Sequence, residues 1–196
     1  MKVKICGITN EEDADYSLKM GADIIGVILD FNVKRHGTEE LIDRIKKTHP
    51  ESQIAGVYTS MPVTVGKEDY VQLHFSHSPG DITYVRNIMG KRVISVIDFH
   101  SGDIMGKIIS HLGAGADYIL LEDRDGIIKR KPQLVGLNMK RIGIAGKIDS
   151  SNLKQLVELN PDLIDVSSSL EERTGKKSFE KIDEFFYSLG ERSAVR

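Results

Sequence analysis

The only cysteine of the chain, Cys6, stands where the first short apolar segment, Val3–Cys6, ends. Gly7 and Thr9-Asn10 come next and lead into an acidic helix start. A thiol at the carboxyl end of a strand is well placed to act as a catalytic group, because active sites of parallel barrels lie at those ends. A lone cysteine is otherwise most often a small buried hydrophobic residue. The interpretation of Cys6 therefore depends on what the other strand ends bring beside it.

Other reactive side chains also follow short apolar segments. If those segments are parallel strands, their carboxyl ends gather a thiol, carboxylates, a basic pair and hydroxyl groups on one face. The candidates besides Cys6 are Arg35, Gln72, His74, Asp98, His100, Glu122, Asp123, Gly146, Lys147, Asp165 and Ser167–Ser169. Plainer interpretations exist: Lys34-Arg35 as a solvated pair, Glu122-Asp123 as a turn cap, and His74 as a hydrogen-bonded packing residue. No spacing of His, Asp or Glu indicates a metal site.

Two of these strand ends have the composition of a phosphate site. The segments Ile144–Lys147 and Val166–Ser169 supply glycine and serine, and each precedes a predicted helix. Small residues let backbone N–H groups approach an anion, and a helix amino terminus adds a favourable dipole. Phosphate sites after the seventh and eighth strands are frequent in barrels. The signal predicts a phosphorylated small-molecule substrate without naming the reaction.

The elements that must position these residues alternate regularly along the chain. Helical patterns with start signals lie between short β-branched segments, and two connections, Ser60–Asp69 and Arg124–Asn138, hold only a turn or two of helix each. The predicted strands are Val3–Cys6, Asp23–Leu29, Gln53–Tyr58, Tyr70–His74, Arg92–Ile97, Asp117–Leu121, Arg141–Ala145 and Leu163–Ser167. Longer helices are expected after Thr9 and Thr38 and over Asp81–Met89, Asp103–Leu112, Ser151–Leu159 and Ser178–Leu189.

Strands that alternate with helices predict a parallel sheet with right-handed crossovers. Eight strands favour an α/β fold made of a single (β/α)8 TIM barrel over residues 1–196, with shortened helices after strands 3 and 6. Those short connections explain why the chain falls below the roughly 250 residues typical of this fold. An open doubly wound sheet is the alternative, although no Gly-x-Gly-x-x-Gly dinucleotide motif follows the first strand.

Composition excludes several classes of protein. Of the 196 residues, 40% are hydrophobic and 29% are charged, which is typical of a globular chain that buries a core without disulfides. A single cysteine suits a reducing compartment, and we expect a cytoplasmic protein. The formal charge of −2 gives no general attraction to nucleic acid or to an anionic membrane. No apolar run approaches the roughly 20 residues that span a bilayer. The sequence leaves the oligomeric state open, and a homo-oligomer is compatible with it.

The chain resembles the phosphoribosylanthranilate isomerase family, barrel enzymes of tryptophan biosynthesis that carry out an Amadori rearrangement. The resemblance extends over nearly the whole chain and is weak from residue 75 to residue 140. The segments that carry it are Lys2–Thr9, Gly21–Gly26, Val71–His74 and Asp165–Ser168, the last followed by Glu171 and Gly175–Lys177.

The resemblance implies an isomerase that converts N-(5-phosphoribosyl)anthranilate to 1-(o-carboxyphenylamino)-1-deoxyribulose 5-phosphate without a cofactor or a metal. Cys6 would be the base that takes the proton from the sugar carbon next to the imine. Glu122 or Asp123 would be the acid that opens the furanose ring. Arg35 would pair with the anthranilate carboxylate, a task suited to a guanidinium group. The other substrate-binding residues would be Gly146, Lys147, Asp165, Ser167, Ser168 and Ser169.

The two catalytic groups have opposite requirements. A carboxylic acid that donates a proton at neutral pH needs its pKa raised by burial or by a neighbouring carboxylate. A thiolate needs nearby positive charge or a helix amino terminus. Which of Glu122 and Asp123 faces the pocket depends on strand register, because a shift of one residue moves every side chain to the other face.

The chain departs from the family pattern at functional places. Glu122-Asp123-Arg124 stands where the family has an aspartate and a glycine-rich loop, and Lys147 and Ser169 occupy places that are usually glycine. Lost glycines limit the close approach of backbone to phosphate, whereas Lys147 adds a charge there. Two alternatives follow from these departures: a related barrel enzyme acting on another phosphorylated sugar or aminosugar, and a non-enzymatic ligand-binding paralogue.

Overall fold

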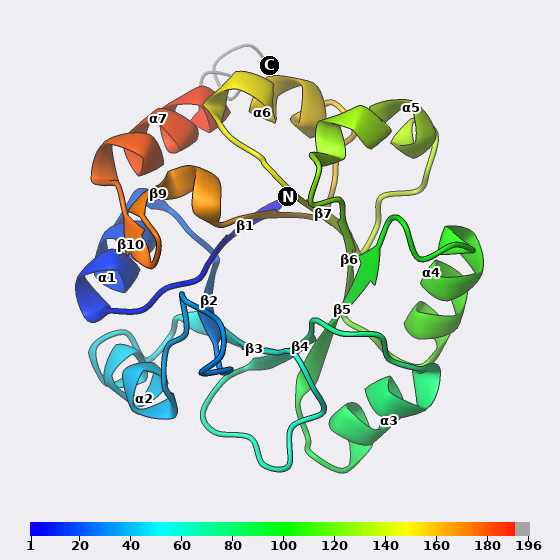
Figure 1. Cartoon of the computed structure of the whole chain (residues 1–196), viewed down its shortest axis with the longest axis horizontal. Coiled ribbons are helices and arrows are strands. Elements are labelled where there is room, and N and C mark those ends of the chain that lie inside the picture. The colour runs from blue at the N-terminus through cyan, green and yellow to red at the C-terminus, as the bar shows by residue number, and fades with distance from the viewer. Residues whose placement is uncertain (191–196) are drawn as a thin grey trace.

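Eight parallel strands close into one barrel, in which β1 pairs with both β2 and β8 (Figure 1). The structure is a computed structural model, and it describes residues 1–190. The strands are β1 (Lys2–Cys6), β2 (Ile24–Ile28), β3 (Gln53–Tyr58), β4 (Tyr70–Leu73), β5 (Arg92–Asp98), β6 (Tyr118–Glu122), β7 (Ile142–Ala145) and β8 (Leu163–Val166). The closed barrel confirms the predicted fold class and excludes the open sheet. The last six residues of the predicted domain, 191–196, lie outside the described residues.

Helices cover the outside of the barrel, as Figure 1 shows. They are α1 (Glu11–Met20), α2 (Glu39–Thr48), α3 (Pro79–Asn87), α4 (Ile104–Gly113), α5 (Lys131–Leu134), α6 (Ser150–Val157) and α7 (Phe179–Gly190). Five of them begin after a residue whose side chain accepts a hydrogen bond from a backbone N–H in the first turn; these caps are Asn10, Thr38, Ser78, Asp103 and Asp149. No helix in the described part of the chain is long and apolar enough to cross a membrane.

The two short connections turn out differently from one another. After β6 the chain forms a 3-10 helix, η1 (Ile127–Arg130), and the single turn of α5, as expected. The segment between Tyr58 and Tyr70 contains no helix at all, so the predicted short helix there is wrong. Pro62 and Gly66 leave few residues that favour a helix in this segment. Buried Glu68, which accepts a hydrogen bond from the Tyr58 hydroxyl, anchors the segment instead.

Two apolar layers follow from the alternation of side chains along each strand. One set, including Ile24, Tyr70 and Leu120, packs together inside the barrel. The other set, including Ile25, Val71 and Leu121, packs against the helices. Because successive residues point to opposite faces, residues of one parity at each strand end point into the barrel mouth and their neighbours point toward the helices.

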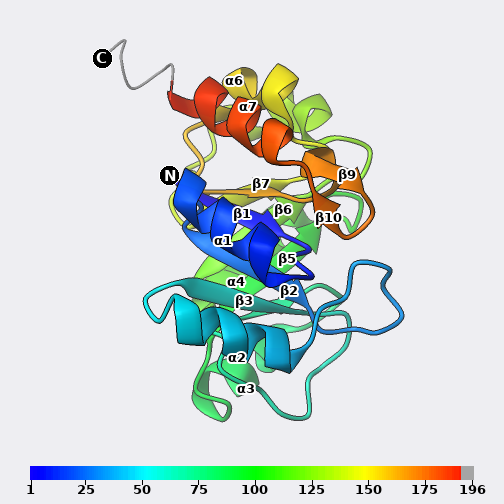
Figure 2. The same ribbon diagram turned by 90° about the vertical axis from the view of Figure 1, so that its left-hand side faces the viewer.

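A short hairpin and a loop project from the carboxyl end of the barrel. After β8 come a 3-10 turn, η2 (Ser168–Leu170), and the antiparallel pair β9 (Glu171–Arg173) and β10 (Lys176–Lys177). Figure 2 shows this hairpin and the loop after β2 on the same side of the molecule, away from the amino terminus. The hairpin therefore lies where it can contribute to a site at the strand ends.

A buried chain of hydrogen bonds joins β5 to the neighbouring helical layer. Nδ1 of His77 donates to the carbonyl of Phe75 (2.6 Å), so its Nε2 accepts from the hydroxyl of Ser95 (2.9 Å). The Ser95 oxygen in turn accepts from Nδ1 of His111 on α4 (2.8 Å). Both imidazoles are neutral in this arrangement. Burial, with smaller contributions from His77 and Lys107, lowers the pKa of His111 to about 4.

The hydrogen-bonded series His77–Ser95–His111 leads us to predict that the protein loses stability in acid. A histidine whose pKa is depressed by folding stabilises the native state above its unfolded pKa of about 6.5. That contribution is lost as the pH falls from about 6.5 toward 4. The free energy of unfolding should therefore fall by about 3 kcal/mol more in the wild type than in His111→Gln over this interval. Urea unfolding at several pH values measures the difference, and equal losses in both proteins would contradict it.

Candidate active site

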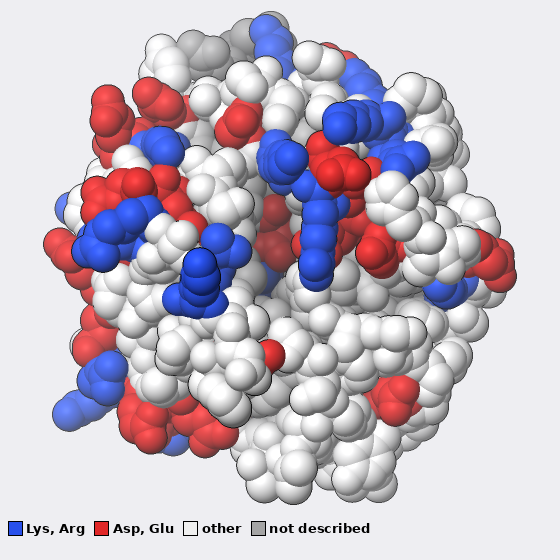
Figure 3. All heavy atoms as spheres, in the orientation of Figure 1, with Lys and Arg blue, Asp and Glu red and all other residues white. Residues whose placement is uncertain are grey.

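A cavity of about 460 Å³ lies at the carboxyl ends of the strands. Figure 3 shows a hollow at the centre of the face it displays, with acidic and basic side chains gathered around it. The residues that line the cavity from the strands, or directly after one in the case of His74, are Cys6, Ile28, Val57, Gln72, His74, Glu122, Ala145 and Asp165. The loop residues are Val33, Arg35, Thr59, Arg124, Gly146–Ile148 and Ser167–Ser169. Every residue given a catalytic or substrate-binding role by the resemblance lines this one cavity except Asp123, and the candidates Asp98 and His100 also lie outside its lining.

Cys6 lines the cavity although its side chain is nearly buried. It packs against Ile28 and Val57, and 7% of the residue remains exposed. Burial raises the pKa of the Cys6 thiol, Asp165 adds to the increase, and Lys4 and Lys177 act in the opposite direction. The positive charge that we expected near the sulfur is present, but it does not outweigh burial. The resting group is therefore a thiol.

A buried ion pair lies directly beside the sulfur. Nζ of Lys4 is 2.9 and 3.0 Å from the two carboxylate oxygens of Asp165, and Lys4 has no exposed surface. The β1–β8 register places the two residues opposite each other on adjacent strands. A Cβ on Gly26 would lie 2.8 Å from the Lys4 nitrogen and 2.9 Å from the Cys6 sulfur, so only glycine leaves room for both groups.

Glu122 is the carboxylate that points into the cavity. Its Oε2 lies 3.2 Å from Nε2 of His74 and 3.5 Å from Nε of Arg124. Burial alone would raise the pKa of Glu122, but the hydrogen bond and charge of His74, together with Arg124, lower it overall. The raised pKa expected for a resting acid is therefore not found. His74 is hydrogen-bonded as expected, yet it belongs to the cavity wall rather than to the packing alone.

Asp123 points away from the cavity, toward the helical layer. It is fully buried, accepts a hydrogen bond from Nε of Arg130 (2.6 Å) and another from the backbone N–H of Asp125. His100 and Asp125 offer further ligand atoms within 4.8 Å, a spacing that could hold a metal ion. The guanidinium of Arg130 already supplies the positive charge there, since its Nη2 also lies 3.3 Å from His100.

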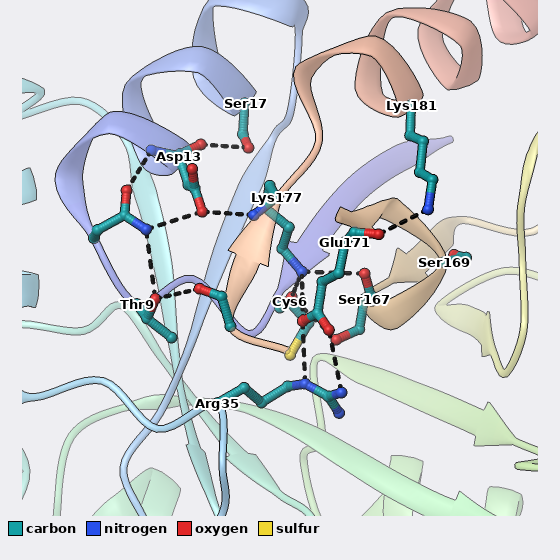
Figure 4. A network of polar contacts seen from close by, with 12 residues as sticks. Cys6, Thr9, Asp13, Ser17, Arg35, Ser167, Ser169, Glu171, Lys177 and Lys181 are labelled. Atoms are coloured by element: carbon teal, nitrogen blue, oxygen red, sulfur yellow. Dashed lines mark hydrogen bonds and ion pairs between the residues drawn. The ribbon is translucent and has the colours of Figure 1, made fainter. Parts of the chain in front are cut away.

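Arg35 reaches the cavity from the loop after β2, held by a carboxylate from the hairpin (Figure 4). Its Nε and Nη2 donate to the two oxygens of Glu171, at 3.1 and 3.3 Å. Lys177, which is buried, donates to the carbonyl of Cys6 (2.7 Å), the carbonyl of Ser167 (3.1 Å) and the nearer oxygen of Glu171 (3.4 Å). The hairpin thus connects the arginine to the backbone of the cysteine.

The residues predicted to bind phosphate form a further part of the cavity wall. Gly146 has a φ of +118°, and a Cβ there would lie 1.9 Å from the carbonyl oxygen of Asp123. Lys147 is exposed, and Ser168 and Ser169 begin the 3-10 turn after β8. The expected dipole of the helix after β7 is not free for an anion, because the carboxylate of Asp149 caps the amino terminus of α6.

Four residues of the site lie outside the sequence-based prediction of roles. Lys4, Glu171 and Lys177 surround the thiol and the arginine, and Arg124 stands beside Glu122. Lys4 could have been found, because Lys4 and Cys6 have the same parity on one strand and a charge inside a barrel requires a partner. Nothing in the sequence alone shows that the hairpin folds back onto β1.

Fold and site together define a (β/α)8-barrel enzyme whose cavity lies at the carboxyl ends of its strands. The family model described as N-(5'-phosphoribosyl)anthranilate (PRA) isomerase matches residues 125–188. An N-(5'-phosphoribosyl)anthranilate isomerase of Thermoplasma volcanium is 39% identical over 192 residues, which cover 96% of each chain. One from Lacticaseibacillus casei is 30% identical and covers 96% of this chain and 94% of its own. The chain belongs to the phosphoribosylanthranilate isomerase family.

Solved structures agree with this assignment. The phosphoribosyl anthranilate isomerase of Thermus thermophilus superimposes with a TM-score of 0.84 at 26% identity, over 100% of both chains. A phosphoribosyl anthranilate isomerase in complex with reduced 1-(o-carboxyphenylamino)-1-deoxyribulose 5-phosphate gives a TM-score of 0.82 at 25% identity, over 97% of this chain and 99% of that one. The similarity extends over the whole barrel.

The backbone at Gly146 yields a prediction. Gly146→Ala combines a left-handed φ with a clash against the Asp123 carbonyl, whereas Gly136→Ala has a φ of +86° with nothing within 4 Å of the new Cβ. We expect Gly136→Ala to cost about 1 kcal/mol of stability and Gly146→Ala about 2 kcal/mol or more. Urea unfolding of both variants checks this order, and equal losses would show that the close approach to Asp123 is unimportant.

Proposed function

We propose that this chain converts N-(5'-phosphoribosyl)anthranilate to 1-(o-carboxyphenylamino)-1-deoxyribulose 5-phosphate by acid–base catalysis. The observation that supports this most directly is that a thiol and a carboxyl group, Cys6 and Glu122, line one cavity from strands that are not neighbours. The same cavity has Arg35 at one part of its wall and Lys147 with Ser168 at another. A substrate with a carboxylate at one end and a phosphate at the other matches this charge distribution.

The reaction needs one proton donor and one proton acceptor. Protonation of the furanose oxygen breaks its bond to C1 while the nitrogen lone pair forms a C=N bond. The Cys6 thiolate then removes the proton from C2, and the C–H electrons form a C1=C2 bond in an enaminol. A proton then adds to C1 while the C2 hydroxyl loses its proton, and the O–H electrons form the C=O bond of the ketone. Glu122 is the donor in this scheme and Cys6 the acceptor.

The lowered pKa of Glu122 is compatible with this role. The substrate brings a phosphate and a carboxylate, and negative charge near a carboxyl group raises its pKa. Binding also removes water from the cavity, which acts in the same direction.

Arg35 retains donors for the anthranilate carboxylate. A guanidinium has five N–H donors, and Glu171 engages only one on Nε and one on Nη2. The remaining edge can bind a second carboxylate in a bidentate manner. At the other end, Lys147 provides a positive charge, and Gly146 and Ser167–Ser169 provide backbone and hydroxyl groups for the phosphate.

The assignment of acid and base is testable by substitution, with fluorescence loss as N-(5'-phosphoribosyl)anthranilate is consumed. Cys6→Ser and Glu122→Gln should each lower kcat by about 10²–10⁴-fold, because each removes a proton-transfer group. Asp123→Asn is the matched control: it should retain most of the activity and lose stability, since Asp123 pairs with Arg130 outside the cavity. Loss of activity in Asp123→Asn with retention in Glu122→Gln would reverse the assignment.

The pH profile tests the base. Because burial raises the pKa of the Cys6 thiol, the fraction of thiolate still increases above the ordinary cysteine value. We expect kcat/KM to continue rising at about pH 8.5, the ordinary cysteine pKa. Cys6→Ser should lack this rise. A wild-type profile that is flat from about pH 7 upward would contradict a thiol as the titrating base.

A further inference from the structure

The charged groups around the Cys6 sulfur, four of them buried and Arg35 partly exposed, carry an unbalanced charge. We call these five residues the thiol charge cluster: Lys4, Arg35, Asp165, Glu171 and Lys177. Three of them are cations and two are anions, so the cluster has a formal charge of +1 while Cys6 is a thiol. Loss of the thiol proton brings the total to zero. A buried set of charges is most stable when it is balanced.

Lys4 is the cation beside the sulfur. An ammonium group has three N–H donors, and two of them are used by the two oxygens of Asp165. The third is left for the Cys6 side chain, whose charge and hydrogen-bonding capacity raise the pKa of Lys4 together with Asp165. The point where a Gly26 Cβ would lie is within 2.9 Å of both the Lys4 nitrogen and the Cys6 sulfur, so the two groups border the same small space beside Gly26.

Lys177 supplies a second positive charge next to the backbone carbonyl of Cys6. Its nitrogen lies 2.7 Å from the carbonyl oxygen of Cys6, and its side chain has almost no exposed surface. Figure 4 shows Lys177, from β10, above the sulfur of Cys6, from β1. Glu171 lies between Lys177 and Arg35. Glu171 is shared between Arg35 and Lys177, and Asp165 pairs with Lys4, so two anions face three cations.

The remaining charged groups of the cavity do not supply the missing negative charge. Glu122 on β6 pairs with Arg124 and with His74 on β4. Lys147 on the loop after β7 is exposed and adds positive charge. The thiolate is therefore the anion that completes the set.

We propose that Lys4 and Lys177 are the buried counter-cations that stabilise the Cys6 thiolate once the thiol loses its proton, Lys4 from the space beside Gly26 and Lys177 through the adjacent peptide. The inference extends the proposed function by naming what stabilises the base, and Lys4 acts as a positioning residue for the charge on sulfur. When the thiolate takes the C2 proton, the S–H bond forms, the C–H bond breaks and its electrons move into the substrate. The excess positive charge then returns to the cluster and favours release of the proton to C1.

The test is the rate of alkylation of Cys6 by iodoacetamide as a function of pH, because only the thiolate reacts and the chain has one cysteine. Lys4→Met should slow alkylation about tenfold or more at each pH below the thiol pKa, because a tenfold change corresponds to one pKa unit. Asp165→Asn should have the opposite effect and speed alkylation, because it removes the anion beside the sulfur. Lys177→Met should slow it to a smaller extent.

Opposite signs separate this role from a structural one, since a loosened barrel would expose the sulfur and speed alkylation in both variants. Lys67→Met, which removes an exposed lysine before β4, controls for net charge and should leave the rate unchanged. Faster or unchanged alkylation in folded Lys4→Met overturns the proposal, as does slower or unchanged alkylation in Asp165→Asn. The assay needs no turnover, so a failure of isomerase activity in the wild type would overturn the proposed function and leave this result intact.

Discussion

The ammonium group of Lys4 lies inside the barrel, between the two oxygens of Asp165 and the sulfur of Cys6. A cation without exposed surface is tolerated only when its partners are fixed, because desolvation costs several kcal/mol for each ion. Here the partners are fixed by the β1–β8 register, which is the pairing that closes the barrel. The pairing that closes the barrel therefore also places the thiol beside the Lys4–Asp165 ion pair. Gly26, on the next strand, leaves space for the Lys4 ammonium and the sulfur.

The same constraint explains how much of the site could be predicted from the sequence. The eight strands and their carboxyl ends follow from apolar segments separated by helical patterns, and these brought Cys6, Glu122 and Asp165 together correctly. The choice between Glu122 and Asp123 needed the register of β6, which the structure supplies: Leu120 packs inside the barrel, so Glu122 two residues later points into its mouth. A shift of one residue in register would exchange Glu122, which lines the cavity, with Asp123, which is buried against the helical layer.

Interactions between distant segments could not be predicted in this way. The contact of Glu171 with Arg35 spans 136 residues, and that of Lys177 with the Cys6 carbonyl spans 171. No local pattern records such pairings. The pKa directions were also missed, because the resting thiol and the ionised Glu122 both result from the balance of burial against specific neighbours. The absent helix after β3 has a local cause in Pro62 and Gly66, and the predicted turn there was wrong.

The most direct test of the account is a crystal structure of this chain with reduced 1-(o-carboxyphenylamino)-1-deoxyribulose 5-phosphate, the compound bound to a relative of the same fold. We expect the sulfur of Cys6 and the carboxyl group of Glu122 on opposite sides of the sugar carbons. The anthranilate carboxylate should contact Arg35, and the phosphate should lie at Gly146 and Ser168. A bound compound that leaves Cys6 or Glu122 out of contact with the sugar carbons would contradict the assignment of base and acid.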